Sequence, residues 1–586
     1  MDGCRRFQVS LPARSWCRVL RPGKLQGKLQ GKLQALGLIT SLLLASIASS
    51  QTVEGTPSSG TPANAAAASR GTSVSSLDAL DDVMLRGEQL ERDGQWADAL
   101  SLYQTALKKS PDHQPLIQRR SLARIHYDLG RRYADTSFLN QISRTAPAQA
   151  QNAYAEVLLK VQSYYVDVPD WDRLTRCGLM DLQIALHNQE FRAAHLPNLT
   201  DARLDEVLAS LAKTLDQTSV RQRSDSVLVA NHTAEYLQEH LGLPVSATLY
   251  EFVSGAMAAL DPYSSYMSES QYGETMSQIE GNFVGLGVEL KTHKDRLEIV
   301  NVINGGPAGL GGLLPGDCIL AIDNVSVLQT GSEKAADNLR GPDGSSVILD
   351  VRREGQPAQA VRLQRRKVDI PSVDQVGLVD RANGVGYIRL TNFQKTTSRD
   401  FDAALWQLQR DGMRSLIVDV RGNPGGLLTA AVEVADRFVY DGVIVSTKGR
   451  NPLEDFVHRA EQPGTWRVPL VVLVDEDSAS ASEIFAAAIR DHKRGVVVGH
   501  QSYGKGSVQG IFPLNIGGGG VRLTTAKFFS PNGQPIAQVG VLPDVPVETV
   551  SKPAVSTFSS EADQDAALQV GISVARREAQ TAFAGR

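Results

Sequence analysis

A serine and a lysine in the C-terminal half of the chain have the types and spacing of a nucleophile and its base. Ser480 opens the segment Ser-Ala-Ser-Glu, which fits a capping box, and an apolar, alanine-rich helical pattern follows as far as Arg490. Ser480 is therefore expected at a helix N-terminus, where the N–H of Ala481 and the helix dipole would stabilise an oxyanion. Capping boxes are common, so this segment alone is equally typical of a serine that only caps a helix.

A lysine in a second segment favours catalysis. The strand pattern from Arg494 to His500 leads into a glycine-rich loop that carries Lys505, twenty-five residues after Ser480. A lysine accepts a proton only when it is neutral, so its pKa must fall well below the ordinary value of about 10.4, and burial among apolar groups lowers it. Gln509, four residues further on, is placed to orient the amine without adding a charge.

These segments together resemble the C-terminal processing peptidases, also called tail-specific proteases. The resemblance rests on the run Ser-Ala-Ser-Ala-Ser-Glu-Ile, on Gly-Lys-Gly and on the glutamine that follows it. It implies a Ser-Lys serine peptidase in which Ser480 is the nucleophile, Lys505 the general base and Gln509 the residue that orients the lysine. Asp491 sits where the family often has an acid, and both a structural and a catalytic role stay open for it.

A glycine turn supplies a second family signature. The β-branched strand of Leu416–Gly426 ends in Asn-Pro-Gly-Gly, and the helical pattern Leu427–Val439 follows. In the family this turn provides an oxyanion N–H, here from Gly425 or Gly426, with Ala481 as its partner. Phosphate-binding loops also begin with a strand, a glycine turn and a helix, but this turn lacks their glycine and lysine spacing, so a phosphate site is the weaker interpretation.

A Ser-His-Asp arrangement is an alternative to the Ser-Lys pair. It would combine Ser480 and Asp491 with His492 or His500. At 1.5 Å per helical residue, His492 lies roughly 18 Å along the helix from Ser480, which removes it. His500 ends a strand and could approach the site, but a lone loop histidine is more often structural than catalytic.

Upstream of these motifs, residues 282–367 resemble a PDZ domain of the type inserted in these peptidases. Gly285-Leu-Gly287 and the strand that starts at Val288 match the carboxylate-binding loop and the edge strand to which a peptide adds. The resemblance implies that backbone N–H groups capture a C-terminal carboxylate. Pockets beside Phe283, Leu286 and Val288 would then favour an apolar last residue. A generic β-rich insert with glycine turns is the alternative.

The chain is predicted to be a multidomain α/β protein of 586 residues. It is expected to have an α-helical N-terminal region, a β-rich PDZ domain and, as the resemblance implies, an α/β peptidase core of crotonase-like/ClpP-like fold. The expected divisions are a signal peptide (1–50), a flexible linker (51–79), a tetratricopeptide-like segment (80–146), a helical N-terminal domain (147–280), the PDZ domain (281–367), the serine peptidase core (368–550) and a C-terminal tail (551–586).

The helical N-terminal region carries the positions of a single tetratricopeptide repeat. Small, aromatic and proline residues fall on that pattern at Gly87, Gly94, Trp96, Ala99, Tyr103, Ala106 and Pro111. Fewer than about three such repeats rarely stand alone. A hairpin that packs on its neighbours and a surface that binds a protein partner are therefore both open.

The first residues have the plan of a secretory signal. Eight basic side chains against Asp2 alone precede the apolar run Ala35–Ala48, and small residues follow. That run is short for a membrane span, which needs about 20 residues. Export to the periplasm or the extracellular space with cleavage near Ala48–Ser50 is expected, with an uncleaved membrane anchor as the alternative.

Composition narrows the function further. A formal net charge of −4 gives no basis for nucleic-acid binding. Cys4, Cys17, Cys177 and Cys318 form no disulfide framework, and the histidines lack ligand spacing, so no metal and no cofactor are predicted.

The sequence predicts an exported serine endopeptidase that acts through an acyl-enzyme. Its expected partners are polypeptides with accessible, apolar C-termini that the PDZ domain recognises. The competing hypothesis is a non-catalytic scaffold in which the PDZ and helical segments bind peptides and the peptidase core is inactive.

Overall fold

The computed structural model describes residues 72–584, apart from 216–217, 304, 463–464, 517 and 549–563. The predicted signal peptide and most of the predicted linker lie outside the described residues. Residues 72–79 were expected in the linker, but they belong to helix α2 (Thr72–Arg92). Within the described ranges, none of the helices combines the length and hydrophobicity that a bilayer span requires.

The chain begins with a helix hairpin formed by α2 and α3 (Trp96–Lys109), and α4 (Gln114–Ala134) packs against α3. Gly94 makes the turn with a φ of 71°. Only glycine fits at position 87, because the buried ring of Tyr103 lies against it. A Cβ on Gly87 would come within 2.2 Å of the Tyr103 hydroxyl. The predicted hairpin is therefore present, whereas its description as tetratricopeptide-like stays a prediction.

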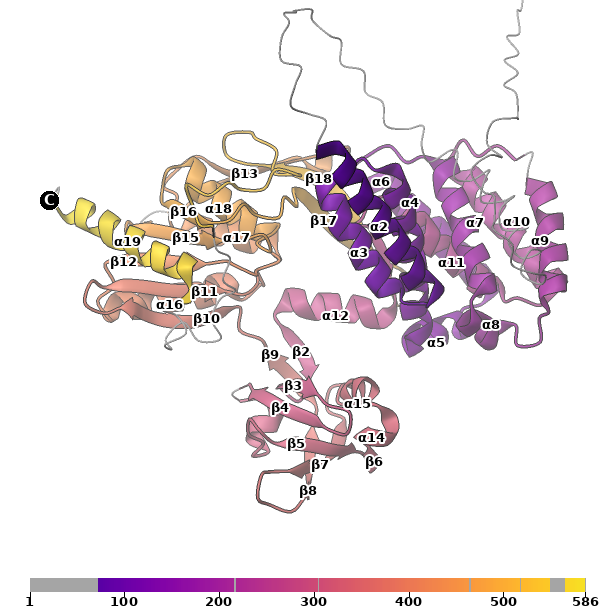
Figure 1. Cartoon of the computed structure of the whole chain (residues 1–586), viewed down its shortest axis with the longest axis horizontal. Helices are drawn as coiled ribbons and strands as arrows, with labels where there is room; N and C mark the ends of the chain where they lie inside the picture. The colour runs from indigo at the N-terminus through magenta and orange to yellow at the C-terminus, as the bar shows by residue number, and fades with distance from the viewer. Residues whose placement is uncertain are drawn as a thin grey trace, which may run out of the picture.

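A larger helical layer follows and shares its core with the peptidase sheets. Its helices are α5 (Thr136–Arg144), α6 (Pro147–Tyr164), α7 (Trp171–His187), α8 (Gln189–His195), α9 (Asp201–Leu215), α10 (Arg223–Leu241) and α11 (Val245–Ala258). Leu514, Val521 and Leu523, which come from the far end of the chain, are buried in the same apolar cluster. The helical region thus packs directly on the sheet that carries these residues (Figure 1).

Helix α12 (Glu269–Glu280) leads into the PDZ domain, which projects from the rest of the molecule on a two-stranded ribbon (Figure 1). The ribbon pairs β2 (Asn282–Gly285) with β9 (Arg366–Asp369). The PDZ sheet has the order β3-β4-β5-β7-β8, with β6 on β5. Its elements are β3 (Val288–Thr292), β4 (Leu297–Val302), α13 (Pro307–Leu310), β5 (Cys318–Ile322), β6 (Val325–Ser326), α14 (Val327–Thr330), α15 (Ser332–Asn338), β7 (Ser346–Arg352) and β8 (Gln359–Gln364).

Two sheets form the peptidase core. The first has the order β10-β11-β12-β15-β16-β19 and is parallel except at β10, and its strands are mostly buried apolar runs, as a covered parallel sheet requires. The second has the order β1-β18-β13-β14, with β17 also on β18. The strands are β1 (Ser265–Met267), β10 (Val373–Asp380), β11 (Val385–Leu390), β12 (Ser415–Asp419), β13 (Val443–Gly449), β14 (Phe456–Arg459), β15 (Leu470–Val474), β16 (Val496–Gly499), β17 (Ser507–Pro513), β18 (Gly520–Phe529) and β19 (Val545–Pro546).

Helices cover both faces of the first sheet. One face carries α16 (Thr397–Arg410), α17 (Leu428–Asp436) and α18 (Ala481–Asp491), and the other carries α19 (Ala566–Ala584). Residues 551–586 were expected to form a C-terminal tail. Instead Leu568 and Ile572 of α19 are buried against the sheet, and Asp565 pairs with the buried Arg421. The C-terminal segment therefore completes the core.

Candidate active site

Ser480 lies at the N-terminus of α18, where the chain turns sharply after β15. Its backbone has φ 57° and ψ −112°, a conformation that is costly for a residue with a side chain. Such strain persists only where the surrounding contacts impose it, and it is frequent at functional sites. The amide N–H of Ala481, the first helical residue, has no acceptor in the described part of the chain. The predicted nucleophile thus stands beside an available donor.

Glu483 imposes this conformation. The carboxylate is fully buried, and its Oε2 accepts a hydrogen bond from Ser480 N at 2.8 Å, as the capping box predicts. Its Oε1 accepts from Ser502 Oγ at 2.6 Å and from Gly504 N at 2.6 Å. Burial raises the pKa of Glu483, and these donors oppose the rise because they stabilise the charged form. One acidic side chain therefore holds the helix and the following glycine loop together.

The same carboxylate brings the predicted base to the predicted nucleophile. Glu483 Oε2 also accepts from Lys505 N at 2.9 Å, so the amide nitrogens of Ser480 and Lys505 both lie against one oxygen atom. Glu483 therefore holds the two backbone segments together, while a hydrogen bond between Ser480 Oγ and Lys505 Nζ is not found among the described residues, so the dyad stays a prediction. Sequence reasoning had assigned Glu483 only the role of a helix cap.

The Lys505 amine is held in surroundings that favour its neutral form. Its Nζ lies 5.1 Å from the centre of the Tyr263 ring. Burial lowers the pKa of Lys505, and the positive charge of Arg522 lowers it further, whereas Glu483 and Asp261 act in the opposite direction. A lysine with a lowered pKa is the form that can accept a proton from a serine hydroxyl.

Gln509 reaches the lysine side of the site indirectly. Its Nε2 donates to Ser507 Oγ at 2.9 Å and contacts Thr524 Oγ1 at 3.4 Å. Thr524 Oγ1 in turn donates to Asp261 Oδ1 at 3.0 Å. In the residues that the structure describes, Gln509 makes no hydrogen bond to Lys505, although sequence reasoning expected a direct one. Gln509 instead belongs to a polar network that ends at Asp261.

The glycine turn after β12 lies against the nucleophile. A Cβ on Gly425, which has φ 104°, would come within 2.7 Å of Ser480 Cβ and 2.9 Å of Ala481 N, so only glycine fits there. The N–H of Gly425 donates to Asn423 Oδ1 at 2.8 Å. The N–H of Gly426 has no acceptor among the described residues. Of the two predicted donors, Gly426 is therefore the one whose N–H is available.

Two residues of the alternative Ser-His-Asp arrangement, Asp491 and His492, lie at the C-terminal end of α18, away from Ser480. Asp491 ends α18, and its Oδ2 accepts from Ser530 Oγ at 2.6 Å. His492 caps the same helix end and contacts Val443 O at 2.7 Å. The Nε2 of His500 is buried and has no partner among the described residues. Asp491 thus holds a loop at the far end of the helix that begins at Ser480, which favours its structural role.

Sequence reasoning missed the residues around the lysine. Asp261, Tyr263 and Arg522 were assigned no chemistry. Asn423, which orients the glycine turn through Gly425 N and also donates to Leu390 O at 2.9 Å, was seen only as a turn residue. Nothing in the sequence around Arg522 marks it as a neighbour of Lys505.

The predicted carboxylate-binding loop is formed by backbone atoms. Gly287 has φ 77°, and its carbonyl accepts from Ile303 N at 2.8 Å, while Leu286 O accepts from Ala308 N at 2.8 Å. In the described residues, the N–H groups of Leu286 and Gly287 have no acceptor. They are therefore available to an anion.

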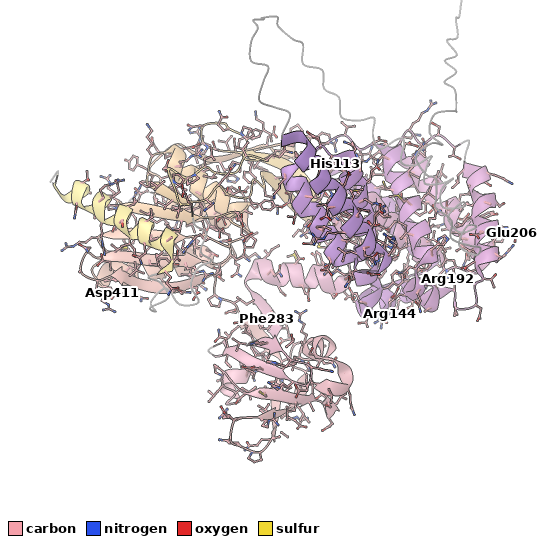
Figure 2. The ribbon with its side chains drawn as sticks, in the orientation of Figure 1. His113, Arg144, Arg192, Glu206, Phe283 and Asp411 are labelled. Atoms are coloured by element: carbon pink, nitrogen blue, oxygen red, sulfur yellow. The ribbon has the colours of Figure 1, made fainter. Side chains whose placement is uncertain are left out.

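The predicted side chains of the peptide pocket separate into three places. Val288 lies on the free edge strand β3, against which α15 packs. Leu286 is buried in the core of the PDZ domain, so it does not line a surface pocket. Phe283 belongs to the connecting ribbon (Figure 2). Its ring lies over Gly285. Only Val288 lies on the strand that a peptide would extend.

Within the described ranges, no group of three or more His, Cys, Asp or Glu side chains is arranged to hold a metal ion. Cys177 and Cys318 are both free thiols.

Comparisons with known proteins place these features in a family. Residues 384–547 match the model of peptidase family S41, and residues 298–353 match a PDZ domain model. The carboxy-terminal-processing protease of Bartonella bacilliformis is 36% identical over 320 residues, covering 53% of this chain and 72% of that protein. The carboxyl-terminal-processing protease of a Synechocystis species is 33% identical, covering 56% and 78%. A probable CtpA-like serine protease of Staphylococcus aureus is 31% identical, covering 49% and 58%. The chain therefore belongs to the carboxy-terminal-processing proteases, serine proteases of peptidase family S41 that carry a PDZ domain.

Proposed function

We propose that this protein is an exported serine endopeptidase that cleaves polypeptides through a Ser480–Lys505 dyad. The observation that carries the proposal is the shared oxygen of Glu483, which binds the amide nitrogens of both residues. A lysine with a lowered pKa and a serine with a strained backbone at a helix N-terminus are thereby held in one site.

The reaction proceeds in two steps. Neutral Lys505 takes the proton of the Ser480 hydroxyl while Ser480 Oγ attacks the carbonyl carbon of the substrate. The resulting ammonium returns the proton to the leaving amine as the peptide bond breaks, which leaves an acyl-enzyme. Water then gives up a proton to Lys505 and attacks the ester carbonyl. As the ester bond breaks, the Lys505 ammonium returns the proton to Ser480 Oγ, and the carboxylic acid product leaves.

The oxyanion of each tetrahedral intermediate is held by backbone N–H groups. Ala481 N–H and Gly426 N–H serve as the two donors, because neither has another acceptor among the described residues. Gly425 contributes the space that lets the turn approach Ser480, and Asn423 fixes the turn by accepting from Gly425 N.

The PDZ domain selects substrates by their C-terminal tails. The free N–H groups of Leu286 and Gly287 bind the terminal carboxylate, and the tail adds to the edge of β3 from Val288 onwards. The substrates are polypeptides with accessible, apolar C-termini. The predicted signal segment delivers the enzyme to the periplasm or the extracellular space, and the helical N-terminal region is a candidate surface for a protein partner.

The test is mass spectrometry of an unfolded protein with an apolar C-terminus after incubation with the enzyme. The parent, Ser480→Ala and Lys505→Ala are compared, with Lys213→Ala as a control that removes an exposed lysine of α9. The parent and the control should cleave, and the two site variants should not. A substrate with an amidated tail should be cleaved more slowly by the parent. Tail binding without cleavage by the parent would instead support the non-catalytic scaffold.

A further inference from the structure

A cavity of about 350 Å³ lies where the N-terminal helices meet the peptidase core. Helices α4, α11 and α12 and strand β1 form most of its wall, and strand β18 contributes one residue. The charged side chains that line it are Arg124, Asp128, Arg131, Arg132, Glu274 and Arg522. Four arginines therefore face two carboxylates.

The two lining carboxylates already have arginine partners. Asp128 Oδ2 lies 3.4 Å from Arg124 Nε, and Glu274 pairs with Arg340 of the PDZ domain. By contrast, Arg131 and Arg522 make no ion pair with a carboxylate in the described part of the chain. The lining therefore carries more arginines than carboxylates, and although the charge of Asp261 acts on Arg522, neither Arg131 nor Arg522 has a salt-bridge partner among the described residues.

The arginines of α4 are placed there by helical periodicity. Positions 124, 128, 131 and 132 recur at spacings of three and four, so their side chains share one face of the helix. Arg132 extends to Asp181 and Glu251 at the base of this wall, while its Nε is buried and has no hydrogen-bond partner. A helix face that is turned toward the rest of the protein is usually apolar. Arginines grouped on such a face need an anion to compensate their charge, so we read them as a binding site for an anionic ligand.

The cavity adjoins the lysine side of the active site. Arg522 Nε donates to Tyr263 O at 3.1 Å, and the ring of Tyr263 lies next to Lys505 Nζ. On its other side the cavity reaches α12, whose Glu274 contacts the PDZ domain through Arg340. The cationic cavity thus lies between the proposed capture site for substrate tails and the proposed base.

We propose that this cavity binds a carboxylate group of the polypeptide substrate while the scissile bond lies at Ser480. The proposal rests on the proposed function, and it adds a specificity site for acidic groups close to the cleavage point. Guanidinium groups suit a carboxylate because they donate two parallel, charge-assisted hydrogen bonds. The carboxylate can come from an Asp or Glu side chain or from the free C-terminus of a short tail.

The experiment uses the full chain and a set of acetylated, amidated peptides in which one Glu is moved along a neutral sequence. Each is paired with a peptide that has Gln at that position, and kcat/KM is measured for both. At one position or more the parent should prefer Glu by about tenfold, as one charge-assisted contact allows. Arg131→Gln should reduce that preference, and Arg124→Gln combined with Arg131→Gln should remove it. Glutamine keeps a high helix propensity, so α4 is preserved.

Arg144→Gln is the matched control, because Arg144 is an exposed arginine of α5 that does not line the cavity (Figure 2). It should keep the parent's preference. A further pair of peptides that end at the preferred position, one with a free acid and one amidated, shows whether a terminal carboxylate substitutes for the side chain. A preference that Arg131→Gln leaves unchanged, or no preference at any position, would overturn the proposal.

A second readout separates this proposal from the proposed function. Fluorescence anisotropy of the labelled Glu and Gln peptides is measured with full-chain Ser480→Ala, so that cleavage is not required. Binding of the Glu peptide should be tighter, Arg131→Gln should reduce the difference, and Arg124→Gln combined with Arg131→Gln should remove it. If the parent cleaves no peptide but this difference is present, the carboxylate site stands and the catalytic proposal fails. If the parent cleaves both peptides equally and they bind equally, the catalytic proposal stands and the carboxylate site fails.

Discussion

The nucleophile side and the lysine side of the active site are assembled over very different distances along the chain. On the nucleophile side, Glu483 bonds to Ser480 three residues away and to Gly504 twenty-one residues away. On the lysine side, Thr524 bonds to Asp261 across 263 residues, and Arg522 bonds to Tyr263 across 259. The nucleophile side is thus built from residues close together in the peptidase core. The lysine side forms only because the helical region packs on β18.

The geometry of the nucleophile and the protonation of the lysine are therefore controlled from different parts of the chain. Geometry at the nucleophile comes from strain and from one buried carboxylate, which a short motif can encode. The protonation of Lys505 depends on burial and on the charges of Arg522 and Asp261, which reach it from distant segments. We therefore expect changes near Ser480 to remove activity outright and changes around Lys505 to alter its pH dependence.

The largest effect should come from Ser480→Ala and Lys505→Ala. Each should lower kcat/KM by about 10³-fold or more, and the double variant should be no slower than either, because residues that act as one unit are not additive. Rates of peptide hydrolysis are measured for the parent, the two single variants and the double variant, and circular dichroism verifies that each is folded. Additive losses would mean that the two residues act in separate steps.

Glu483→Gln tests the link between the two halves. The substitution keeps the shape of the side chain but replaces a carboxylate that accepts four hydrogen bonds with a neutral amide. The amide NH₂ group cannot accept a hydrogen bond, so it would face N–H and O–H groups that have lost their acceptor. We expect kcat to fall by roughly a hundredfold and the free energy of unfolding to fall by about 2–3 kcal/mol. Denaturant titration and single-turnover kinetics measure the two. Normal activity in the folded variant would show that Glu483 does not position Ser480 and Lys505.

Gln509→Ala should have a smaller effect, because Gln509 acts through Thr524 and Asp261. We expect about a tenfold loss of kcat/KM. Gln509→Ala should also shift the pH–rate profile of kcat/KM. Thr524→Val, which removes the next member of the network, should shift that profile in the direction in which Gln509→Ala shifts it. A profile that moves with neither substitution would show that the network only packs the sheet.

Arg522→Gln addresses the protonation of Lys505 directly. The pKa of Lys505 is lowered in the folded protein, so activity should rise with pH through that lowered value as the amine becomes neutral. Arg522 contributes to the lowering, and its removal should move the rising limb of kcat/KM to higher pH, so the variant loses more activity at low pH than on the plateau. A limb that stays in place would indicate that burial alone sets the pKa.

Asp491→Ala should have the smallest effect on catalysis. Asp491 accepts from Ser530 at the end of α18 that is remote from Ser480, so the loss of this bond should cost about 1–2 kcal/mol of stability. The kcat of the folded variant should equal that of the parent, and thermal unfolding should show a lower Tm. A large fall in kcat without loss of stability would restore a catalytic role for Asp491.

Sequence reasoning reached much of the architecture because periodicity and turns are local. The capping box at Ser480 predicted the start of α18, and apolar runs predicted the core strands that begin at Leu416 and follow Arg494, whereas the PDZ domain was predicted from its resemblance to a known domain. It failed where long-range packing decides. Residues 72–79 are helical and not part of a linker, and α19 covers a sheet face through contacts that its own sequence does not reveal.

Short motifs were enough to indicate the family and, through that resemblance, the candidate nucleophile, base and oxyanion donors, because each motif is a set of residue types at short spacings. The surroundings of the lysine, the available glycine N–H and the position of the cationic cavity emerged from the folded chain alone. The physical reason is that pKa shifts and cavities depend on burial and on charges brought together from distant segments, and neither is visible in a local pattern.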